Sequence, residues 1–545
     1  MSLWDELTRE TTLRRTIWEW DDSAYRETSY ADLVDGARRA AAGLRRRGVQ
    51  PGDVVPAVIT NGPAAIRGVT GIWFAGATVA SLPIPARGMT IPNYVAQLGR
   101  LCASLDAKWL LADDRVVAIA GDLDVDVIDY ASLTATEERL DIEPPPLDGV
   151  VFIQFSSGTT GEPRGVELTG RAIERQVHVL AERQAIDPER DFGGTWLPMS
   201  HDMGFIGAFV MRWYSGISGF RSPPERFLQA PQTWLDDCAR FGTTITGVPP
   251  FALALAARAE KLRPSTAKLA LRLCAVGAER IDWSVLTAAA DTLGPRGLGL
   301  DVLTPGYGLA ENTLAVTLAD LDAPPRYLDV DAEALAEGTV RVVDPGASEG
   351  ESARRLVSCG TPLEGVGVRI DGASGEIVVA GPSLGLGYHR NPEATRARFR
   401  DGELWTADLG FMRDGELYVV GRTDDVLIVG GRNVHVKDVE TALSAESGVR
   451  TGNCAIVDVP RPGGADIALV AELDGESVDA RALSARLRKA SLDSAGVPID
   501  RFVFLPRGKF PKTPSGKAQR YRCRSIAQRP DVAIEVVDLG VSPDA

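Results

Sequence analysis

The chain has 545 residues, which is long enough for more than one domain, because single hydrophobic cores rarely grow beyond about 300 residues. Its 59 basic and 74 acidic residues give a formal net charge of −15, which argues against general binding to nucleic acid or to an anionic membrane surface. The six cysteines include no CxxC pair, so the sequence predicts neither a zinc site nor a disulfide framework and favours a reduced, cytoplasmic setting.

The first part of the chain alternates helical and strand patterns, which is typical of α/β sheets with parallel strands. The uncharged residues 68–86 are long enough to raise the question of a membrane span. Because they contain three glycines and two prolines, we expect a buried helix followed by a strand instead. Helices are predicted at residues 30–47, 64–74, 171–184 and 250–262, and strands at 54–59, 78–84, 109–112, 125–129, 150–155 and 271–276.

From about residue 326 the pattern changes to short strands, at 356–359, 366–370 and 375–379, which predicts a small β-rich subdomain. The polar stretch PGASEGESARR, residues 345–355, predicts a surface loop or insertion. The last part of the chain predicts a small α+β unit. We therefore expect a large N-terminal domain, residues 1–421, and a C-terminal domain, residues 422–545, that meet at the turn-rich GRTDD.

The stretch SSGTTGEPRG, residues 156–165, directly follows a predicted buried strand. Glycines allow successive backbone N–H groups to point inward as an anion nest, and the hydroxyl groups add donors. A phosphate cradle is therefore one interpretation. It is not a Walker loop, because GxxxxGK[ST] is absent, and a flexible surface loop explains the stretch taken alone about equally well.

Two later stretches carry aromatic and acidic groups suited to a nucleotide. In TPGYGLAENT, Tyr307 stands between glycines and can offer a flat face to a base, and Glu311 is a hard oxygen ligand suited to Mg²⁺. In ELWTADLG…GRTDD, Asp408 can accept hydrogen bonds from both ribose hydroxyls and Arg422 can bind ribose or phosphate oxygens. The simpler alternatives are a carboxylate at a helix start and a charged surface hairpin.

The fourth stretch, PKTPSGKAQR, places Lys517 in a short loop near the C-terminus. Taken alone, a single lysine in such a loop is no more than part of a solvated tail. No GxSxG elbow supports a hydrolase, and the four histidines form no readable metal cluster.

Together the four stretches resemble, in order and spacing, the adenylate-forming superfamily of acyl- and aryl-CoA synthetases, nonribosomal peptide synthetase adenylation domains and firefly luciferase. The resemblance covers essentially the whole chain. It implies ATP and Mg²⁺ as cofactors, a mobile C-terminal domain that rotates about Asp424, and a catalytic Lys517. It further implies that ATP is bound by Ser156, Ser157, Gly158, Thr159, Thr160, Gly161, Gly277, Ala278, Glu279, Tyr307, Gly308, Asp408 and Arg422, with Thr160 and Glu311 assisting catalysis and Glu311 binding the metal.

A narrower resemblance links TWLPMSHDMGFIGAF to the fatty acyl-AMP ligases, whose usual form is LPxYHDMGLIG. It implies that His201, Asp202, Met203 and Gly204 shape the acyl-binding wall. The long step from Glu311 to Gly360 also resembles the insertion of these ligases. The sequence departs from the family at Arg164, where lysine is usual, at Ala407, where glycine is usual, at Met199-Ser200, and in GRNVHVKDVE.

The expected function is ATP-dependent activation of a fatty or other carboxylic acid to an acyl-adenylate. The resemblance implies that the acyl group is then transferred to the phosphopantetheine thiol of an acyl carrier protein, with CoA a less expected acceptor. An acyl-CoA or aryl-CoA synthetase is the alternative enzyme, and a non-catalytic relative that binds nucleotide or carrier protein is the alternative of another class. The sequence does not specify the acid.

Overall fold

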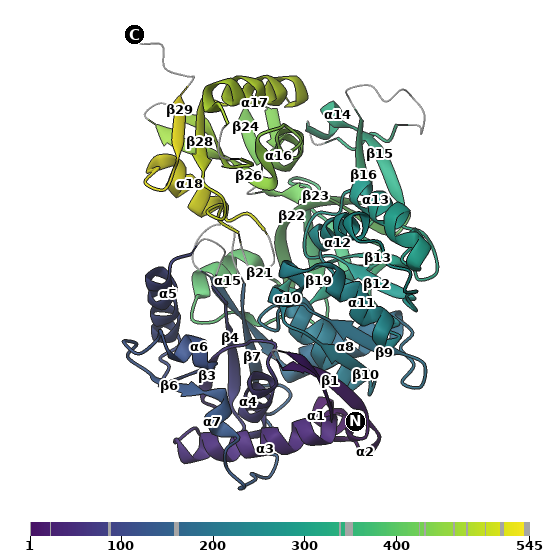
Figure 1. Cartoon of the computed structure of the whole chain (residues 1–545), viewed down its shortest axis with the longest axis vertical. Helices are drawn as coiled ribbons and strands as arrows, with labels where there is room; N and C mark the ends of the chain where they lie inside the picture. The colour runs from purple at the N-terminus through teal and green to yellow at the C-terminus, as the bar shows by residue number, and fades with distance from the viewer. Residues whose placement is uncertain are drawn as a thin grey trace.

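The structure is a computed structural model that describes residues 2–21, 23–85, 89–156, 163–336, 339–343, 353–423, 426–429, 432–461, 464–475, 478–495, 497–512 and 517–538. Figure 1 shows a large lower body formed by the first three quarters of the chain, with the C-terminal domain above it. The architecture agrees with the expected α/β class: a large N-terminal domain built around several sheets and a C-terminal domain with a small one.

The first α/β subdomain is built on a sheet whose central strands β7, β4, β3, β5 and β6 are parallel. Its strand order is β20 (Gly387–Tyr388), β8 (Arg164–Thr169), β7 (Val150–Ser156), β4 (Thr78–Leu82), β3 (Val54–Val58), β5 (Trp109–Ala112) and β6 (Asp126–Asp129). The helices of this subdomain include α3 (Tyr30–Arg46), α4 (Pro63–Phe74) and α5 (Ile91–Ser104).

Local sequence signals explain where these helices begin and end. A capping box between Ser29 and Asp32 starts α3, and Gly48, with φ +91°, follows its last turn. The uncharged residues 68–86 form most of α4 and all of β4, both of which are buried, so the prediction of a helix followed by a strand is confirmed. Within the described residues, no helix combines the length and apolar character needed to cross a membrane.

The second α/β subdomain is built on a longer sheet in which β10, β9, β11, β12 and β13 run parallel. Its order is β17 (Thr361–Pro362), β14 (Ala315–Leu318), β13 (Leu303–Gly308), β12 (Leu273–Val276), β11 (Ile245–Val248), β9 (Phe192–Thr195), β10 (Ser218–Arg221), β1 (Thr16–Asp21) and β2 (Ala24–Ser29). The helices associated with it include α8 (Gly170–Arg183), η1 (Met203–Val210), α9 (Met211–Tyr214), α11 (Gln232–Phe241), α12 (Pro250–Leu262) and α13 (Trp283–Leu293).

The predicted β-rich subdomain is present as an antiparallel sheet. Its strands are β18 (Gly367–Ile370), β19 (Glu376–Ala380), β22 (Glu403–Arg413), β21 (Phe399–Arg400) and β23 (Glu416–Arg422), with α15 (Pro392–Arg398) alongside. The sequence analysis predicted neither the hairpin formed by β7 and β8 nor the ribbon of β15 (Tyr327–Asp331) with β16 (Ala353–Val357). The first eight residues of the predicted loop, 345–352, lie outside the described residues.

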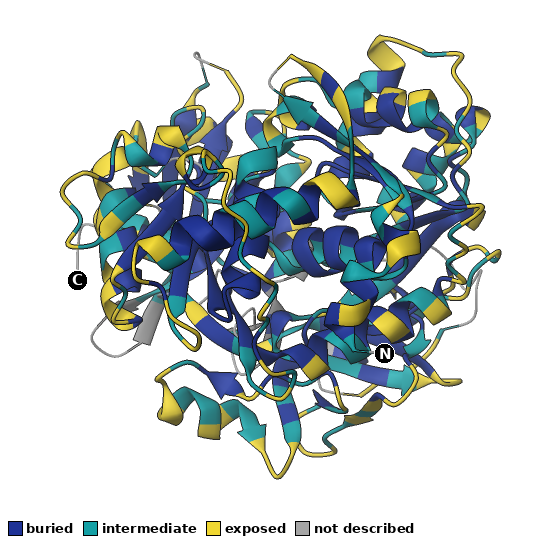
Figure 2. Ribbon diagram, turned by 90° about the horizontal axis from the view of Figure 1, so that it is seen from below, coloured by how far each residue is buried: buried dark blue, intermediate teal, exposed yellow. Residues whose placement is uncertain are grey.

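The C-terminal domain consists of a four-stranded sheet, a small ribbon and three helices. The elements are β24 (Val426–Val429), β25 (Arg432–His435), α16 (Val436–Ser444), β26 (Val449–Arg461), β27 (Gly464–Leu473), α17 (Ala480–Ala495), β28 (Arg501–Leu505), α18 (Arg520–Gln528) and β29 (Glu535–Asp538). Separate buried clusters fill this domain and the large domain, and Figure 2 shows buried residues concentrated along the sheets and the inner faces of helices. The boundary predicted between residues 421 and 422 stays a prediction.

Candidate active site

A cavity of about 2300 Å³ lies between the C-terminal domain and the carboxyl ends of strands β11, β12 and β13. Open α/β sheets characteristically bind ligands at this edge. The cavity is lined by most of the predicted site residues in the described part of the chain, namely His201, Asp202, Met203, Gly277, Ala278, Glu279, Tyr307, Gly308, Glu311, Asp408, Arg422 and Lys517. Groups that are far apart in the sequence are therefore brought to one place.

Tyr307, Asp408 and Arg422 form a connected group on one side of the cavity. The Tyr307 hydroxyl donates to Asp408 Oδ2 at 2.5 Å, and Arg422 Nε lies 3.5 Å from Asp408 Oδ1. The register of β22 and β23 pairs Asp408 with Arg422. An ionised carboxylate offers about four acceptor positions, so Asp408 retains acceptor capacity for two ribose hydroxyls.

Glu311 belongs to a second group that includes Tyr388, a residue the sequence analysis did not identify. The Tyr388 hydroxyl donates to Glu311 Oε1 at 2.7 Å, and the Arg164 guanidinium lies over the Tyr388 ring, 5.5 Å from its centroid. Burial and the neighbouring Glu311 charge raise the pKa of Tyr388, so it stays a hydrogen-bond donor. The only sequence signal for this tyrosine is its place directly after the glycine-rich GLG at residues 385–387.

Residues 277–279 continue from β12 into the cavity wall. Ala278 has φ +68°, a left-handed conformation that L-residues other than glycine rarely adopt. A Cβ added at Gly277 would lie 3.2 Å from the Gly306 carbonyl oxygen, so the wall is tightly packed here. Burial raises the pKa of Glu279 above its ordinary value, against the opposing effect of nearby lysines, of which Lys517 has the largest influence.

The HDMG stretch forms the start of the π-helix η1. His201 Nδ1 and Asp202 Oδ1 are 2.5 Å apart, and Asp202 caps the helix by accepting from the Met203 N–H at 2.6 Å. Burial alone would raise the pKa of Asp202, but the charge and hydrogen bond of His201, followed by the Met203 N–H and Lys517, hold it below its ordinary value. Gly204 is buried behind this wall, where an added Cβ would lie 2.0 Å from the Pro198 carbonyl oxygen.

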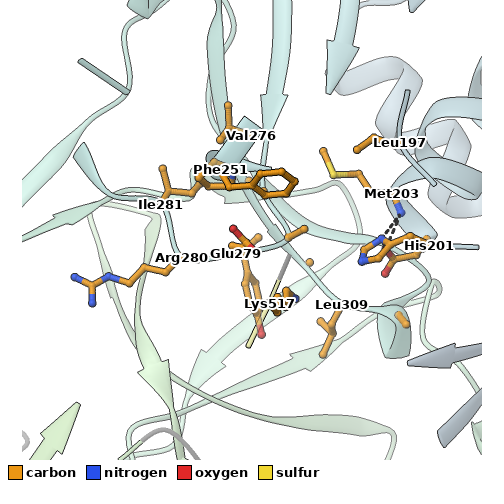
Figure 3. Close-up of a pocket in the computed structure, with 18 of the residues that line it drawn as sticks. Leu197, His201, Met203, Phe251, Val276, Glu279, Arg280, Ile281, Leu309 and Lys517 are labelled. Atoms are coloured by element: carbon orange, nitrogen blue, oxygen red, sulfur yellow. Dashed lines mark hydrogen bonds and ion pairs between the residues drawn. The ribbon is translucent and has the colours of Figure 1, made fainter. Parts of the chain in front are cut away.

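Lys517 is contributed by the C-terminal domain and faces these groups of the N-terminal domain. Its charge acts on the carboxyl groups of both Asp202 and Glu279. Figure 3 shows Lys517 and Glu279 together in the pocket beside Leu309, with His201 and Met203 on the far wall. The sequence offered no reason, apart from the family resemblance, to bring this lysine to the acyl wall.

The wall near Lys517 is largely apolar. Figure 3 shows five apolar side chains that line this part of the pocket: Leu197, Met203, Phe251, Val276 and Ile281. Apolar side chains together with polar groups that orient the ligand are the usual character of a small-molecule site.

Some predicted site residues fall outside the described part of the chain. These are residues 157–161 of the Ser/Thr/Gly loop and the hinge residue Asp424; of Ser156 only the backbone is described, paired with Arg164 across the β7–β8 hairpin. No group of three or more His, Cys, Asp or Glu side chains suited to a metal occurs among the described residues. A metal at Glu311 would therefore share its coordination with the substrate or water.

The fold and this arrangement define an AMP-binding enzyme, and the chain belongs to that family, whose model matches residues 8–389. It is 28% identical, over 91% of its own length and 89% of the other chain, to a medium-chain-fatty-acid–[acyl-carrier-protein] ligase, JamA, of Moorena producens. It is 31% identical to a second ligase of that description, TtuA of Teredinibacter turnerae, over 69% of its own length and 63% of the other.

Solved structures show the same architecture. One from a study of fatty acyl-adenylate ligases of E. coli and L. pneumophila is 25% identical to this chain and superposes with a TM-score of 0.87, over 97% of this chain and 98% of that one. The resemblance to acyl-activating enzymes therefore extends over the C-terminal domain as well as over the residues matched by the family model.

Proposed function

We propose that this chain uses ATP to activate a fatty acid as its acyl-adenylate, releasing pyrophosphate, and then transfers the acyl group to the phosphopantetheine thiol of an acyl carrier protein. The observation that carries the proposal is the presence of Lys517, from the C-terminal domain, in one cavity with the HDMG wall and the Tyr307–Asp408 group. The names of the two ligases similar to this chain support the choice of acid and acceptor.

The difficulty in the first half-reaction is electrostatic. A fatty carboxylate and the α-phosphate of ATP are both anions, so the site must neutralise charge and align the attack. The carboxylate is already ionised near pH 7 and needs no general base. The Lys517 ammonium contacts both reactants, the carboxylate oxygen bonds to the α-phosphorus, and the bond to pyrophosphate breaks. His201 lies beside the carboxylate.

The remaining residues are assigned to the nucleotide and the metal. Asp408 and Arg422 hold the ribose, the Tyr307 ring and residues 277–279 line the adenine, and residues 156–161 hold the phosphates. Glu311, a hard carboxylate oxygen ligand already positioned by Tyr388, fits Mg²⁺. The bound metal supplies charge neutralisation for the departing pyrophosphate, with the hydroxyls of Ser157, Thr159 and Thr160 completing the phosphate site.

The first half-reaction is tested by fatty-acid-dependent exchange of pyrophosphate into ATP. Lys517→Ala should lower the exchange rate by about 10²–10³ or more, the usual cost of losing one preorganised transition-state charge, while ATP still binds. Lys509→Ala, which removes an exposed lysine from the same domain, is the matched control and should retain most of the activity. Exchange at a near-normal rate in Lys517→Ala would refute the assignment.

The acceptor is tested separately by comparing carrier protein with free CoA. We expect thioester to form on the phosphopantetheine arm of the carrier protein in preference to CoA. Preferential formation of acyl-CoA would identify the chain as an acyl-CoA or aryl-CoA synthetase. Absence of any acid-dependent pyrophosphate release would identify a non-catalytic binding relative.

Two further assignments belong to the same proposal. The domains meet between residues 421 and 422 and rotate about Asp424, so that the region around residues 426–431 replaces the Lys517 loop during thioester formation. The setting is cytoplasmic: all six cysteines are free and buried, which suits a reducing compartment.

A further inference from the structure

A buried arginine lies in the cavity wall at a distance from Lys517. Arg212 belongs to α9, which continues η1, and it lines the same cavity as Asp202. The two residues are ten positions apart on the continuous helical segment formed by η1 and α9. Gly207, Ala208 and Met211 line the cavity between them. An acyl chain that extends along this helix from the reacting carboxylate would therefore reach the Arg212 guanidinium.

Arg212 is only 5% exposed, and none of the described carboxylates forms an ion pair with it. Its guanidinium donates to two neutral carbonyl oxygens, of Gly194 at 3.1 Å and of Phe220 at 3.5 Å. Burial lowers the pKa of Arg212 to about 10, so the side chain remains charged at neutral pH. A buried charge normally has a counter-ion, because removal from water costs several kcal/mol that neutral partners offset incompletely.

Two other buried arginines of the described chain follow that rule. Arg221 pairs with Glu19 at 2.5 Å, and Arg296 pairs with Glu260 at 2.8 Å. The burial of Arg212 lies between that of Arg221 and that of Arg296, but Arg212 faces a cavity instead of a glutamate.

Two further polar groups occur in this part of the lining. The Gln184 side chain is 6% exposed and its amide oxygen has no hydrogen-bond partner among the described residues. The Thr246 hydroxyl donates to the Gly194 carbonyl oxygen at 3.0 Å, the same oxygen that accepts from Arg212. All three residues line the cavity, on elements that pack together: α8, α9 and β11 with η1. A purely apolar acyl chain would leave the Arg212 charge without a counter-ion and would give the Gln184 amide no polar partner.

We propose that the acid activated by this chain carries a second oxygen acceptor, most suitably a carboxylate, at the end remote from the reacting carboxylate, and that Arg212 binds it with the Gln184 amide alongside. A guanidinium suits this role because it presents parallel N–H groups to carboxylate oxygens. The inference rests on the proposed function, since it identifies the class of acid that the same site activates.

The test compares three acids of equal chain length: an α,ω-dicarboxylic acid, the ω-hydroxy acid and the plain monocarboxylic acid, over a series of lengths. Pyrophosphate exchange gives kcat/KM for each, and thermal shift gives binding without turnover. At the best length we expect the acid with a distal oxygen to be preferred over the plain acid by at least about tenfold, the lower range for a hydrogen bond to a charged group. A preference for the plain acid at every length overturns the inference.

Arg212→Met replaces the guanidinium with an apolar chain, and the readout is the preference ratio, which does not depend on the folded fraction. The ratio should fall by about tenfold or more. Gln184→Leu should reduce it by less, and Arg212→Lys, which keeps a charge but not the planar fork, should retain part of it. The Arg212 side chain fills the space above Gly193, which is a reason for Arg212→Met to fold poorly. If it fails to fold, Gln184→Leu and Arg212→Lys still test the inference.

Arg258→Met is the matched control, since Arg258 is an exposed arginine on α12 that lines the same cavity. Arg258→Met should leave the preference ratio unchanged. If Arg258→Met lowers the ratio and Arg212→Met does not, the assignment to Arg212 is overturned. The two levels of failure are distinct. If plain fatty acids drive exchange without any preference for a distal oxygen, the proposed function stands and this inference falls. If no acid drives exchange and none raises Tm, both fall.

Discussion

Ala407 lies within β22, at an irregularity in its pairing with β19, directly before the carboxylate assigned to ribose. Its φ of +55° is in the left-handed region, which costs an L-residue about 1–2 kcal/mol. The strained backbone is held by two side chains. Glu376 Oε1 accepts from the Ala407 N–H at 2.6 Å, and Arg398 donates to the Thr406 carbonyl oxygen at 2.8 Å. Glu376 and Arg398 are 3.8 Å apart, so one ion pair fixes the backbone on either side of the strained residue.

Glu376 is therefore expected to act as a positioning residue for Asp408. In Glu376→Ala the Ala407 N–H loses its acceptor, the strained part of β22 relaxes, and KM for ATP should rise by about tenfold or more, with a smaller change in kcat. Glu376→Gln keeps an acceptor oxygen and should restore most of the affinity. Glu403→Ala, which removes a glutamate paired with Arg369 on the same sheet, should leave KM within about twofold. Equal KM values for Glu376→Ala and wild type, measured by pyrophosphate exchange, would contradict this role.

At the residue scale, the sequence predicted the groups that have a recognisable motif and missed their supports. Asp408, Tyr307 and Glu311 stand in short patterns of glycine and acidic or aromatic residues, and chemistry alone suggests a nucleotide. Tyr388 contacts Glu311, which is 77 residues away in the sequence. Glu376 contacts Ala407, which is 31 residues away. No local pattern encodes such a contact, because it depends on how segments far apart in the sequence come to lie side by side.

At the scale of elements, one carboxylate connects the starts of three strands at the end of the long sheet opposite to the cavity. Asp191 precedes β9 and accepts from the Asp187 N–H at 2.9 Å, from the Thr244 hydroxyl before β11 at 2.9 Å, and from Arg272 before β12 at 2.8 and 2.7 Å. Burial alone would raise the pKa of Asp191, but the hydrogen bonds from Arg272, Asp187 and Thr244 lower it to about 2.

The depressed pKa makes this connection dependent on pH. A carboxyl whose pKa falls from about 3.9 to about 2 on folding stabilises the folded state by about 2.5 kcal/mol above pH 5, and loses that contribution as the pH drops from about 5 through the folded pKa. Asp191→Asn should therefore lower the free energy of unfolding of the N-terminal domain by about 2–3 kcal/mol at pH 7, measured by urea denaturation. At pH 3 the stabilisation that comes from the ionised Asp191 carboxylate should be about half of its value at pH 7.

The control for this measurement is Asp141→Asn. Asp141 is 95% exposed and pairs with Arg38 at the surface, so its replacement should change stability by less than about 0.5 kcal/mol at either pH. A destabilisation by Asp191→Asn that is the same at pH 7 and pH 3 would show that the ionised carboxylate is not its source.

The helices and strands that the sequence predicted were recognised from periodicity and end signals. The prediction at residues 250–262 coincides with α12, where Pro250 opens the helix, and the strand predicted at 271–276 contains β12. The hairpin strand β8 was missed, because its six residues, RGVELT, follow the glycine-rich stretch without a clear alternation. The π-helical form of η1 was likewise invisible, since the contact of Gly204 with the Pro198 carbonyl arises only in the folded chain.

At the scale of the whole molecule, the two domains meet with opposite charges across the cavity. Glu279, on the N-terminal side, is influenced by Lys517, Lys437 and Lys512 of the C-terminal domain, as well as by His201 of its own domain. Composition gave no hint of this arrangement, because a net charge of −15 does not reveal where the lysines gather. A buried carboxylate facing cations from another domain favours the arrangement in which the domains are together.

Glu279→Gln should consequently favour separation of the domains. In the absence of nucleotide, fluorescence transfer between one dye on each domain should report a larger mean separation for Glu279→Gln than for wild type, at low ionic strength. Wild type should approach the variant as salt is added, because screening shortens the range of the attraction to about 8 Å at 0.15 M. Glu225→Gln, which neutralises an exposed carboxylate on α10 (Pro224–Gln229) in the same cavity, should resemble wild type.

Acidification should have the same effect as the glutamine substitution, because Lys517, Lys437 and Lys512 favour the ionised form of Glu279, and so oppose the rise in its pKa, while the domains are together. The attraction requires the ionised carboxylate, so it is present above that pKa and is lost as the pH falls through it. Because burial raises the pKa above the ordinary value of 4.5, wild type should begin to separate at a higher pH than an exposed glutamate would allow. The transition should be absent in Glu279→Gln, and a variant that retains it would exclude Glu279 as the group that couples the two domains.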